Sequence, residues 1–295
     1  MGGLGQKTLQ LPTVLGHESS GTVLAVGSEV RHFKPGGRVV NDPLIFCGHC
    51  RACGSGATNM CENREIYGKR RGAFAEHSVI PERVSCPLNE RLTLEEGALL
   101  ENLGIAVHAV EVERHDPGEW AVIRGGGGPI GILAAQALVA GGVSTIITEL
   151  SDTRIQLAWQ ITGALVVDAK REEPVERIMV ETRGRGADFV IEMGACQAVL
   201  DQAFQVVRSC GSIVTIGTFD RPVSFNPFFA LARREIRFQG VMGHTQETWR
   251  RMNQLIDSGR LQLKPLISHI LPLDEYAQGF HMVKRQDAGK VLLKP

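Results

Sequence analysis

The sequence predicts an α/β protein in which a β-rich N-terminal module precedes a parallel sheet flanked by helices. Short strand-like runs broken by Gly and Pro fill the N-terminal third, and from Glu119 onward strands alternate with helices. Such alternation is typical of a parallel sheet, because parallel strands need long, usually helical, crossover connections. A glycine-rich run between the first strand and the first helix of this second region indicates nucleotide binding.

The expected elements follow in chain order. In the N-terminal module we expect strands at GTVLAV, GRVV and FAEHSVI, which cover residues 21–26, 37–40 and 74–80. In the second region we expect strands at WAVIRG, STIITEL, LVVDA, ADFVIEMG and GSIVTIG. The expected helices are IGILAAQALVAGG, SDTRIQLAWQITG and TQETWRRMNQLIDSGRL, and GKVLLKP is the expected closing strand.

Composition limits the possible partners. The 32 basic and 32 acidic residues give a formal net charge of zero, whereas nucleic-acid binders usually carry a basic excess. No apolar run reaches the roughly 20 residues of a membrane span, and no apolar signal-peptide core opens the chain. We therefore expect a cytoplasmic protein with neither nucleic-acid nor membrane partners.

Four of the seven cysteines form the pattern C-x2-C-x2-C-x7-C: Cys47, Cys50, Cys53 and Cys61. In a reducing cytosol such a cluster favours metal binding over disulfides. Four thiolates with no open coordination position describe a structural zinc site, and reduced cysteines or a redox pair are the alternative. We expect Gly48, Gly54 and Gly56 to supply the unusual backbone angles of so tight a loop.

The glycine-rich run GGGGPIG fits the G-x-G-x-x-G pattern of dinucleotide-binding Rossmann folds. Gly126, Gly128 and Gly131 are its three glycines, with Pro129 and Ile130 between the last two. Glycines let the backbone approach a pyrophosphate, and the N-terminus of the following helix carries partial positive charge toward it. The expected strand before the run and the expected helix after it favour dinucleotide binding over a bare strand–helix–strand unit.

The next expected strand ends in an acidic residue, Glu149. A carboxylate at this place accepts hydrogen bonds from the adenosine ribose and repels a 2′-phosphate, so it favours NAD over NADP. Arg154 lies five residues further on and leaves NADP open as the alternative. Since ligands lie beyond the carboxyl ends of parallel strands, we expect EMG at Glu192, and Ile216 and Gly217, to flank the nicotinamide.

Several motifs together resemble the zinc-dependent medium-chain dehydrogenases, the alcohol and polyol dehydrogenase family. These are GHESSG, the four-cysteine pattern, GAFAEHSVIP, ENLGIAVHAV, GGGGPIG, LKPLISH and GKVLL. They are most similar to the branch of L-threonine 3-dehydrogenases and sorbitol or butanediol dehydrogenases. The resemblance implies a Rossmann domain at 104–244 and a GroES-like catalytic domain at 1–103 and 245–295, with the zinc lobe at 47–61.

By the same resemblance, His17 matches a catalytic zinc ligand and Glu18 matches the neighbouring carboxylate that binds or backs the metal. Glu101 matches an acidic position that is a direct or water-mediated ligand. In the family, zinc polarises a secondary alcohol and hydride passes to NAD. The resemblance thus implies a small hydroxy substrate, of threonine, polyol or diol type, and a homodimer or homotetramer.

The chain departs from this family pattern in two ways. Family members carry a C-G-[ST]-D-like motif upstream of GHE, and no such motif precedes His17. We therefore expect a GroES-like domain incomplete at its N-terminus, with impaired activity. The alternatives are a non-catalytic fragment that binds NAD and zinc, or a reductase of the same fold without catalytic zinc. In addition, single residues differ: Gly37 stands where the family often has Asp, and Asn102 stands where the polyol branch often has Pro.

Overall fold

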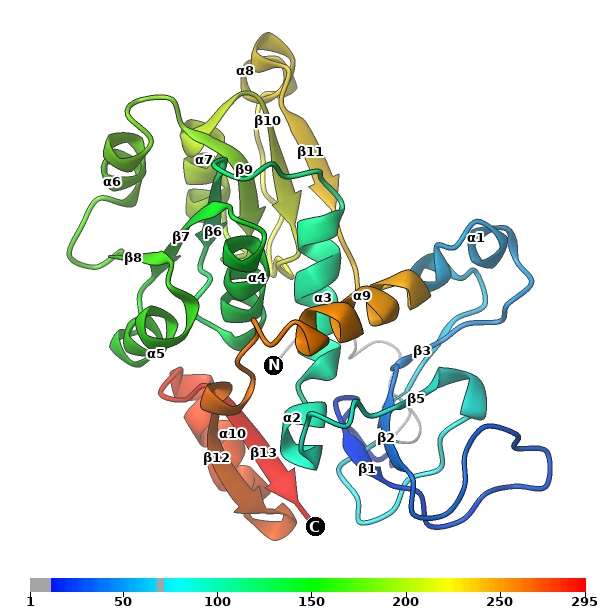
Figure 1. The fold of residues 1–295 in the computed structure, drawn as a ribbon. Coiled ribbons are helices and arrows are strands. Elements are labelled where there is room, and N and C mark those ends of the chain that lie inside the picture. The colour runs from blue at the N-terminus through cyan, green and yellow to red at the C-terminus, as the bar shows by residue number, and fades with distance from the viewer. Residues whose placement is uncertain (1–11, 68–71) are drawn as a thin grey trace.

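The computed structural model describes residues 12–67 and 72–295. Residues 1–11, with which the predicted N-terminal module begins, lie outside the described part. Three regions are visible in Figure 1: a parallel sheet with its helices, a β-rich region from which a cysteine-containing lobe projects around α1, and a C-terminal strand pair with one helix.

The largest sheet has six parallel strands in the order β11-β10-β9-β6-β7-β8. Its strands are β6 (Trp120–Arg124), β7 (Ser144–Glu149), β8 (Leu165–Asp168), β9 (Ala187–Glu192), β10 (Val207–Thr215) and β11 (Arg237–Gly240). The helices between them are α4 (Pro129–Ala140), α5 (Asp152–Thr162), α6 (Pro174–Glu181), α7 (Gln197–Val206) and the short α8 (Pro227–Ala230). The five strands expected in this region are confirmed, and so are the helices expected at 130–142 and 151–163. This is the Rossmann-type sheet that the alternation predicts.

The N-terminal region holds two small antiparallel sheets. One has the order β1-β2-β5 and the other pairs β3 with β4. Their strands are β1 (Ser20–Thr22), β2 (Arg38–Asn41), β3 (Leu44–Ile45), β4 (Glu65–Ile66) and β5 (Ser85–Pro87). The lobe carries the single-turn helix α1 (Arg51–Gly54). The strand expected at GRVV is confirmed as β2.

Two of the N-terminal strand predictions are wrong: one strand is shorter than expected, and the other does not form. The run GTVLAV forms a strand only as far as Thr22, and Leu24 beyond it is 67% exposed. The run FAEHSVI forms no strand in the described chain. Phe74 donates its backbone N–H to Leu15, but Val79 is 73% exposed. A run of strand-forming residues becomes a strand where it packs against the core, and neither run has a buried residue.

The remaining elements join the two regions. They are α2 (Leu94–Gly97), α3 (Leu100–Glu111), α9 (Gln246–Asp257), β12 (Ile267–Pro272), α10 (Tyr276–Arg285) and β13 (Lys290–Lys294). The helix expected at 245–261 is confirmed as α9, and the expected closing strand as β13, which pairs in parallel with β12. Within the described ranges, no helix has both the length and the apolar character to cross a bilayer.

The main core lies between α3, α4 and the sheet. Leu103 and Val107 of α3, and Leu133 and Ala134 of α4, are fully buried in one cluster with Ile123 of β6. Burial of apolar area of this kind is the dominant favourable term in folding. It also fixes α3, which leads out of the β-rich region, against the helix that follows the glycine-rich loop.

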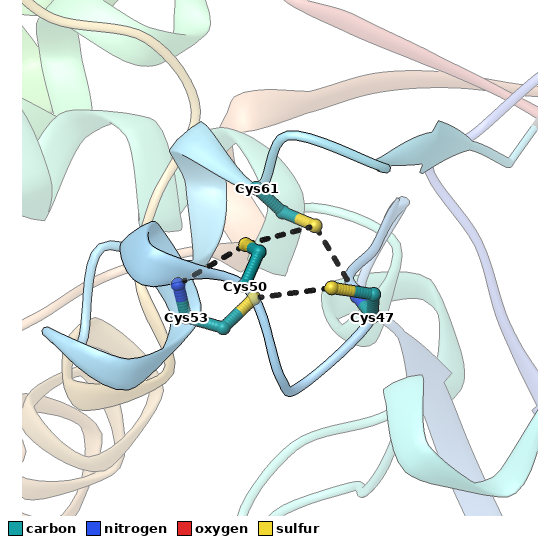
Figure 2. A group of neighbouring side chains, drawn as sticks. All are labelled: Cys47, Cys50, Cys53 and Cys61. Atoms are coloured by element: carbon teal, nitrogen blue, oxygen red, sulfur yellow. Dashed lines mark hydrogen bonds between the residues drawn. The ribbon is translucent and has the colours of Figure 1, made fainter.

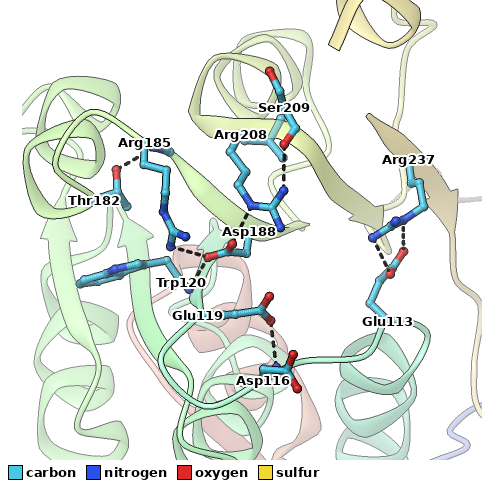
Figure 3. Close-up of polar contacts among 12 residues, drawn as sticks. Glu113, Asp116, Glu119, Trp120, Thr182, Arg185, Asp188, Arg208, Ser209 and Arg237 are labelled. Carbon is cyan, nitrogen blue, oxygen red and sulfur yellow. Dashed lines mark hydrogen bonds and ion pairs between the residues drawn. The ribbon is translucent and has the colours of Figure 1, made fainter. Parts of the chain in front are cut away.

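A buried carboxylate ties the amino ends of β6 and β9 together (Figure 3). Asp188 accepts the backbone N–H of Trp120 at 2.8 Å, Arg208 Nε at 2.6 Å and Arg185 Nη2 at 2.8 Å. Burial opposes ionisation, but the hydrogen bonds from Trp120 and Arg208 outweigh it and lower the pKa of Asp188. This cluster lies at the end of the sheet opposite the glycine-rich loop, so its role is to hold the strands.

Asp188→Asn tests this role. We expect the free energy of unfolding to fall by about 1–3 kcal/mol at neutral pH, because a buried charged acceptor of three hydrogen bonds is lost. Guanidinium denaturation followed by circular dichroism measures it. Since folding depresses the pKa of Asp188, its contribution is present above the ordinary value of 3.8 and lost as the pH falls through the lower folded value.

The matched control is Glu172→Gln, which removes a half-exposed carboxylate 3.9 Å from Arg177. Such a surface pair contributes at most about 1 kcal/mol. Equal destabilisation by the two variants, or a loss in Asp188→Asn that persists unchanged at acidic pH, would contradict the role given to Asp188.

Candidate metal centres and nucleotide-binding loop

The four predicted cysteines converge at one point of the lobe (Figure 2). Their sulfur atoms all lie within 4.8 Å of one another. Cys47 and Cys53 have their Sγ atoms 4.0 Å apart, and Cys50 and Cys61 have theirs 3.9 Å apart. Four sulfurs bound tetrahedrally to zinc at 2.3 Å are about 3.8 Å from each other. The spacing of the thiols therefore fits a four-thiolate zinc site.

Local backbone geometry brings the cysteines together. Cys50 caps α1 and accepts the N–H of Cys53 at 3.5 Å, while Cys61 accepts the N–H of Cys47 at 3.2 Å. Two of the three glycines behave as expected, since Gly48 and Gly56 have φ of +83° and +84°. The expectation is wrong for Gly54, which closes α1 outside the left-handed region.

The thiols differ in their readiness to ionise. The backbone N–H of His49 lowers the pKa of Cys47 to about 6, whereas burial among the other sulfurs raises the pKa of Cys53 to about 12. Without a cation the negative charge is thus shared unequally, because four adjacent thiolates would repel each other. A zinc ion is the partner that allows all four to be thiolates.

The lobe is fastened to the segment between β11 and α9. Asn59 donates its side-chain N–H to the carbonyl of Met242 at 2.8 Å. The backbone N–H of Gln246 donates to Thr58 Oγ1 at 3.3 Å. The lobe therefore holds a segment that follows directly from the parallel sheet.

A second cluster contains the predicted His17, Glu18 and Glu101. One ligand atom from each lies within 4.8 Å of the others. His17 follows Gly16, whose φ of +95° and close contact with Phe74 require glycine. Glu101 lies in the first turn of α3, where the helix dipole favours a carboxylate.

The partners of the two carboxylates differ. Both oxygens of Glu18 are engaged: Oε1 accepts Asn102 Nδ2 at 2.9 Å, and Oε2 accepts the ammonium of Lys290. Only one oxygen of Glu101 is engaged, since Oε2 accepts Asn102 Nδ2 at 3.0 Å. Among the described residues, no donor contacts Glu101 Oε1 or the ring of His17. These two side chains therefore each offer a ligand atom that accepts no hydrogen bond from the described residues, which leaves that atom accessible to a cation.

Burial sets the charge state of this cluster. It raises the pKa of Glu101 to about 7 and lowers the pKa of Lys290 to about 8. Surrounding protein atoms, and then the Lys290 ammonium, lower the pKa of His17, although that residue is exposed at the surface. A neutral imidazole and a carboxyl that ionises near neutral pH make a donor set suited to Zn2+.

The glycine-rich loop has the close contacts that its glycines predict. The N–H groups of Gly125 and Gly126 both donate to the carbonyl of Thr148 on the neighbouring strand. A Cβ on Gly131 would lie 2.3 Å from the carbonyl oxygen of Gly126, so only glycine fits there. Gly128 is the N-cap of α4, without a side-chain cap, which leaves the N–H groups of Ile130 and Gly131 available to an anion.

Glu149 and Arg154 both approach this loop. Glu149 Oε2 accepts the N–H of Gly127 at 3.0 Å, and Oε1 accepts those of Leu150 and Ser151. Nη1 of Arg154 lies 3.9 Å from the point where a Cβ on Gly128 would be. The carboxylate and the guanidinium therefore flank the loop where the adenosine end of a dinucleotide is expected.

The other predicted nucleotide contacts lie at the neighbouring strand ends. The strand order reverses between β6 and β9, which is the switch point where open α/β sheets bind ligands. Ile216 donates its N–H to the carbonyl of Glu192 at 3.1 Å, and a Cβ on Gly217 would lie 2.9 Å from that of Ala195. Ile216 and Gly217 thus lie beside the carboxyl end of β9.

Comparison with known proteins agrees with this arrangement. The zinc-binding dehydrogenase family model matches residues 129–258, and the alcohol dehydrogenase GroES-like domain model matches residues 2–90. An L-threonine 3-dehydrogenase of Bacillus velezensis is 33% identical over 294 residues, which cover 98% of this chain and 84% of that protein. The chain belongs to the zinc-binding dehydrogenase family, with a GroES-like domain and a Rossmann-type sheet.

Two solved structures are also similar to this chain. The 2R,3R-butanediol dehydrogenase of Bacillus subtilis is 30% identical with a TM-score of 0.86, covering 97% of this chain and 81% of its own. A zinc-binding dehydrogenase of Sinorhizobium meliloti bound to NADP has the same identity and TM-score and covers 97% and 85%. The chain is thus similar both to L-threonine 3-dehydrogenases and to a 2R,3R-butanediol dehydrogenase.

Sequence reasoning assigned no role to two residues of the second cluster. Lys290 is separated from Glu18 by most of the chain, and its contact depends on how β13 packs. Asn102 differs from the residue common in the polyol branch, and that difference was the only pattern that pointed to it.

Cys50→Ser tests the lobe. A structural zinc contributes on the order of 10–16 kcal/mol to ordering its site, so we expect loss of the lobe zinc and proteolytic cleavage within 47–61. Metal analysis and limited proteolysis measure these effects. The matched control is Cys210→Ser, because Cys210 is exposed on β10. Undiminished zinc in Cys50→Ser, or equal loss in both variants, would show that the cluster does not bind zinc as described.

Proposed function

We propose that this protein is a zinc-dependent dehydrogenase that transfers hydride between NAD and a secondary hydroxyl of a small substrate, of threonine, polyol or diol type. The observation that carries the proposal is the convergence of His17, Glu18 and Glu101 within 4.8 Å. These residues come from a loop and a helix far apart in the sequence. Membership of the zinc-binding dehydrogenase family supports the same reaction.

The contacts support distinct roles for the three residues. We assign metal binding to His17 and to Glu101 through its free oxygen Oε1. Glu18 backs the site, since Asn102 and Lys290 already occupy both of its oxygens. Zinc bound there would act as a Lewis acid that polarises the substrate hydroxyl and lowers its pKa.

For the cofactor we propose NAD, bound across the loop of Gly126, Gly128 and Gly131. Glu149, directed at this loop, supports NAD, because a carboxylate there repels a 2′-phosphate. Arg154 and the NADP of the Sinorhizobium meliloti neighbour support the alternative. Ile216 and Gly217 are assigned to the nicotinamide end.

The contact of Lys290 with Glu18 supports the division into a catalytic domain, residues 1–103 with 245–295, and a nucleotide domain, residues 104–244. For quaternary structure we propose a homodimer or homotetramer, which the outer edge of β11 supports, since no strand of residues 12–67 or 72–295 pairs with it. The free cysteines support a reducing, cytoplasmic location.

One observation favours a second candidate. The Lys290 ammonium lies against Glu18 and Asn102 and neutralises one charge of the cluster without any metal. Such a contact would stabilise the cluster in a protein of the same fold that binds only the lobe zinc. That protein would be a reductase without catalytic zinc or a non-catalytic nucleotide-binding protein. Metal content separates the two candidates: about two zinc ions per chain support the dehydrogenase and about one supports the alternative.

The first functional test measures NADH formation with L-threonine, sorbitol and 2,3-butanediol, together with zinc content. We expect activity with at least one of them, and we expect His17→Ala to lower kcat by at least about 100-fold and to lose one zinc. The control is His269→Ala, a partly exposed histidine on β12. Only one zinc in the unaltered protein, or full activity in His17→Ala, would favour the second candidate.

Cofactor choice is tested with Glu149→Ser combined with Leu150→Arg. We expect the preference to move from NAD toward NADP, because the repulsive carboxylate is replaced and a cation is added. Calorimetric titration with both cofactors measures it. Leu150→Arg alone is the matched control, and it should keep NAD preference since Glu149 remains. Tighter binding of NADP than NAD by the unaltered protein would overturn the assignment of Glu149.

A further inference from the structure

The side-chain amide of Asn102 makes three hydrogen bonds, all within the second cluster. Its Nδ2 donates to Glu18 Oε1 at 2.9 Å and to Glu101 Oε2 at 3.0 Å. Its Oδ1 accepts Lys290 Nζ at 2.7 Å. The residue is only 5% exposed. A buried amide thus bridges both carboxylates and the ammonium.

The hydrogen bonds of Asn102 do not stabilise helix α3 itself. Asn102 is the third residue of α3, whereas asparagine stabilises a helix end from the N-cap position. The N-cap of α3 is Leu99, and no side chain caps this helix end. Asparagine also has a lower helix propensity than leucine or alanine. Since every hydrogen bond of the amide goes to the charged cluster, its role must lie there.

The two N–H groups of the Asn102 side chain can fix the orientation of both carboxylates. Two carboxylates held close together repel each other, and each can rotate about its last side-chain bond. One amide group that donates to an oxygen of each fixes both rotations and leaves Glu101 Oε1 without a donor. Lys290, fixed by Oδ1, then occupies the second oxygen of Glu18.

We propose that Asn102 is a positioning residue for the catalytic metal: it aims the free oxygen of Glu101 at the cation and holds Glu18 behind it. This inference rests on the proposed function, because it presupposes a cation at His17 and Glu101. It assigns to one side chain the task of orienting two ligand-site carboxylates. Outer groups that orient metal ligands typically change metal affinity by 10–100-fold when removed.

The test compares Asn102→Leu with Gln136→Leu in the zinc-loaded protein. Leucine has the same number and branching of side-chain heavy atoms as asparagine and makes no hydrogen bonds. Gln136 is a matched control, because it is a buried amide on α4 whose two hydrogen bonds go to the backbone of Gln262, away from both metal centres. Competition with a chromophoric chelator measures the affinity of each zinc, and calorimetry measures Tm.

We expect Asn102→Leu to weaken the non-lobe zinc about 10–100-fold and to leave the lobe zinc unchanged. Gln136→Leu should lower Tm while leaving both affinities unchanged. In steady-state kinetics Asn102→Leu should lower kcat without raising KM for NAD. Asn102→Ala, which admits water in place of the amide, provides a second variant should leucine prevent folding.

Wild-type affinity for the non-lobe zinc in both Asn102 variants would overturn the inference while leaving the proposed function standing. Equal weakening by Gln136→Leu would also overturn it, because the effect would then be general destabilisation. Absence of a second zinc from the unaltered protein would instead reject the proposed function, and the positioning role with it.

Discussion

The packing of α3 against α4 is the interaction on which the relation between the two candidate sites depends. The first turn of α3 carries Glu101 of the metal cluster, and the first turn of α4 follows the nucleotide loop. Fully buried small residues, Ala106 on α3 and Ala134 on α4, line their shared core and allow a close approach. Helices packed in this way lie about 8–10 Å apart. Hydride transfer needs substrate and nicotinamide in contact, so this spacing is a functional constraint as well as a structural one.

The fold of the nucleotide-binding region could be predicted almost entirely from the sequence. Strands such as WAVIRG are buried on both faces and so are continuous apolar runs, and the loop glycines have neighbours within their own strand–helix unit. Both signals are local. The N-terminal strands were harder, since FAEHSVI is a short run between Gly72 and Pro81, as a strand often is, but has no core to face. Strand formation depends on packing against neighbouring strands and the core, which such a run does not reveal.

The residues of the candidate sites also differ in whether the local sequence identifies them. Spacing alone identified the four cysteines, because their loop is short enough to fix their approach. His17 and Glu101 came only from resemblance, since 84 positions separate them and no local pattern links them. Lys290 and Asn102 could not be assigned a role at all: their contacts appear only once β13 and α3 are packed. Long-range contacts between charged groups leave no periodicity in the sequence.

The shifted pKa values in the second cluster suggest why a carboxyl group is buried there. Burial shifts Glu101 and Lys290 in opposite directions, the acid upward to a pKa of about 7 and the amine downward to about 8. Each shift moves its group toward the uncharged form, as expected where charges are poorly solvated. Such a site holds its polar groups in place at a cost in stability. A cation that binds there recovers part of that cost, which is a reason for a buried carboxyl in the first turn of α3.

The attachment of the cysteine lobe has a consequence for the cofactor. Asn59 and Thr58 hold the segment from Met242 to Gln246, which follows the carboxyl end of β11, and the nucleotide loop follows the carboxyl end of β6 in the same parallel sheet. If a bound dinucleotide orders this segment, the lobe and the cofactor share one set of contacts. Thermodynamic linkage then requires reciprocity: cofactor binding tightens the hold of the lobe on its metal by the same factor by which the metal tightens cofactor binding. A zinc ion in the lobe, remote from the reacting atoms, would in this way contribute to the affinity of the protein for its cofactor.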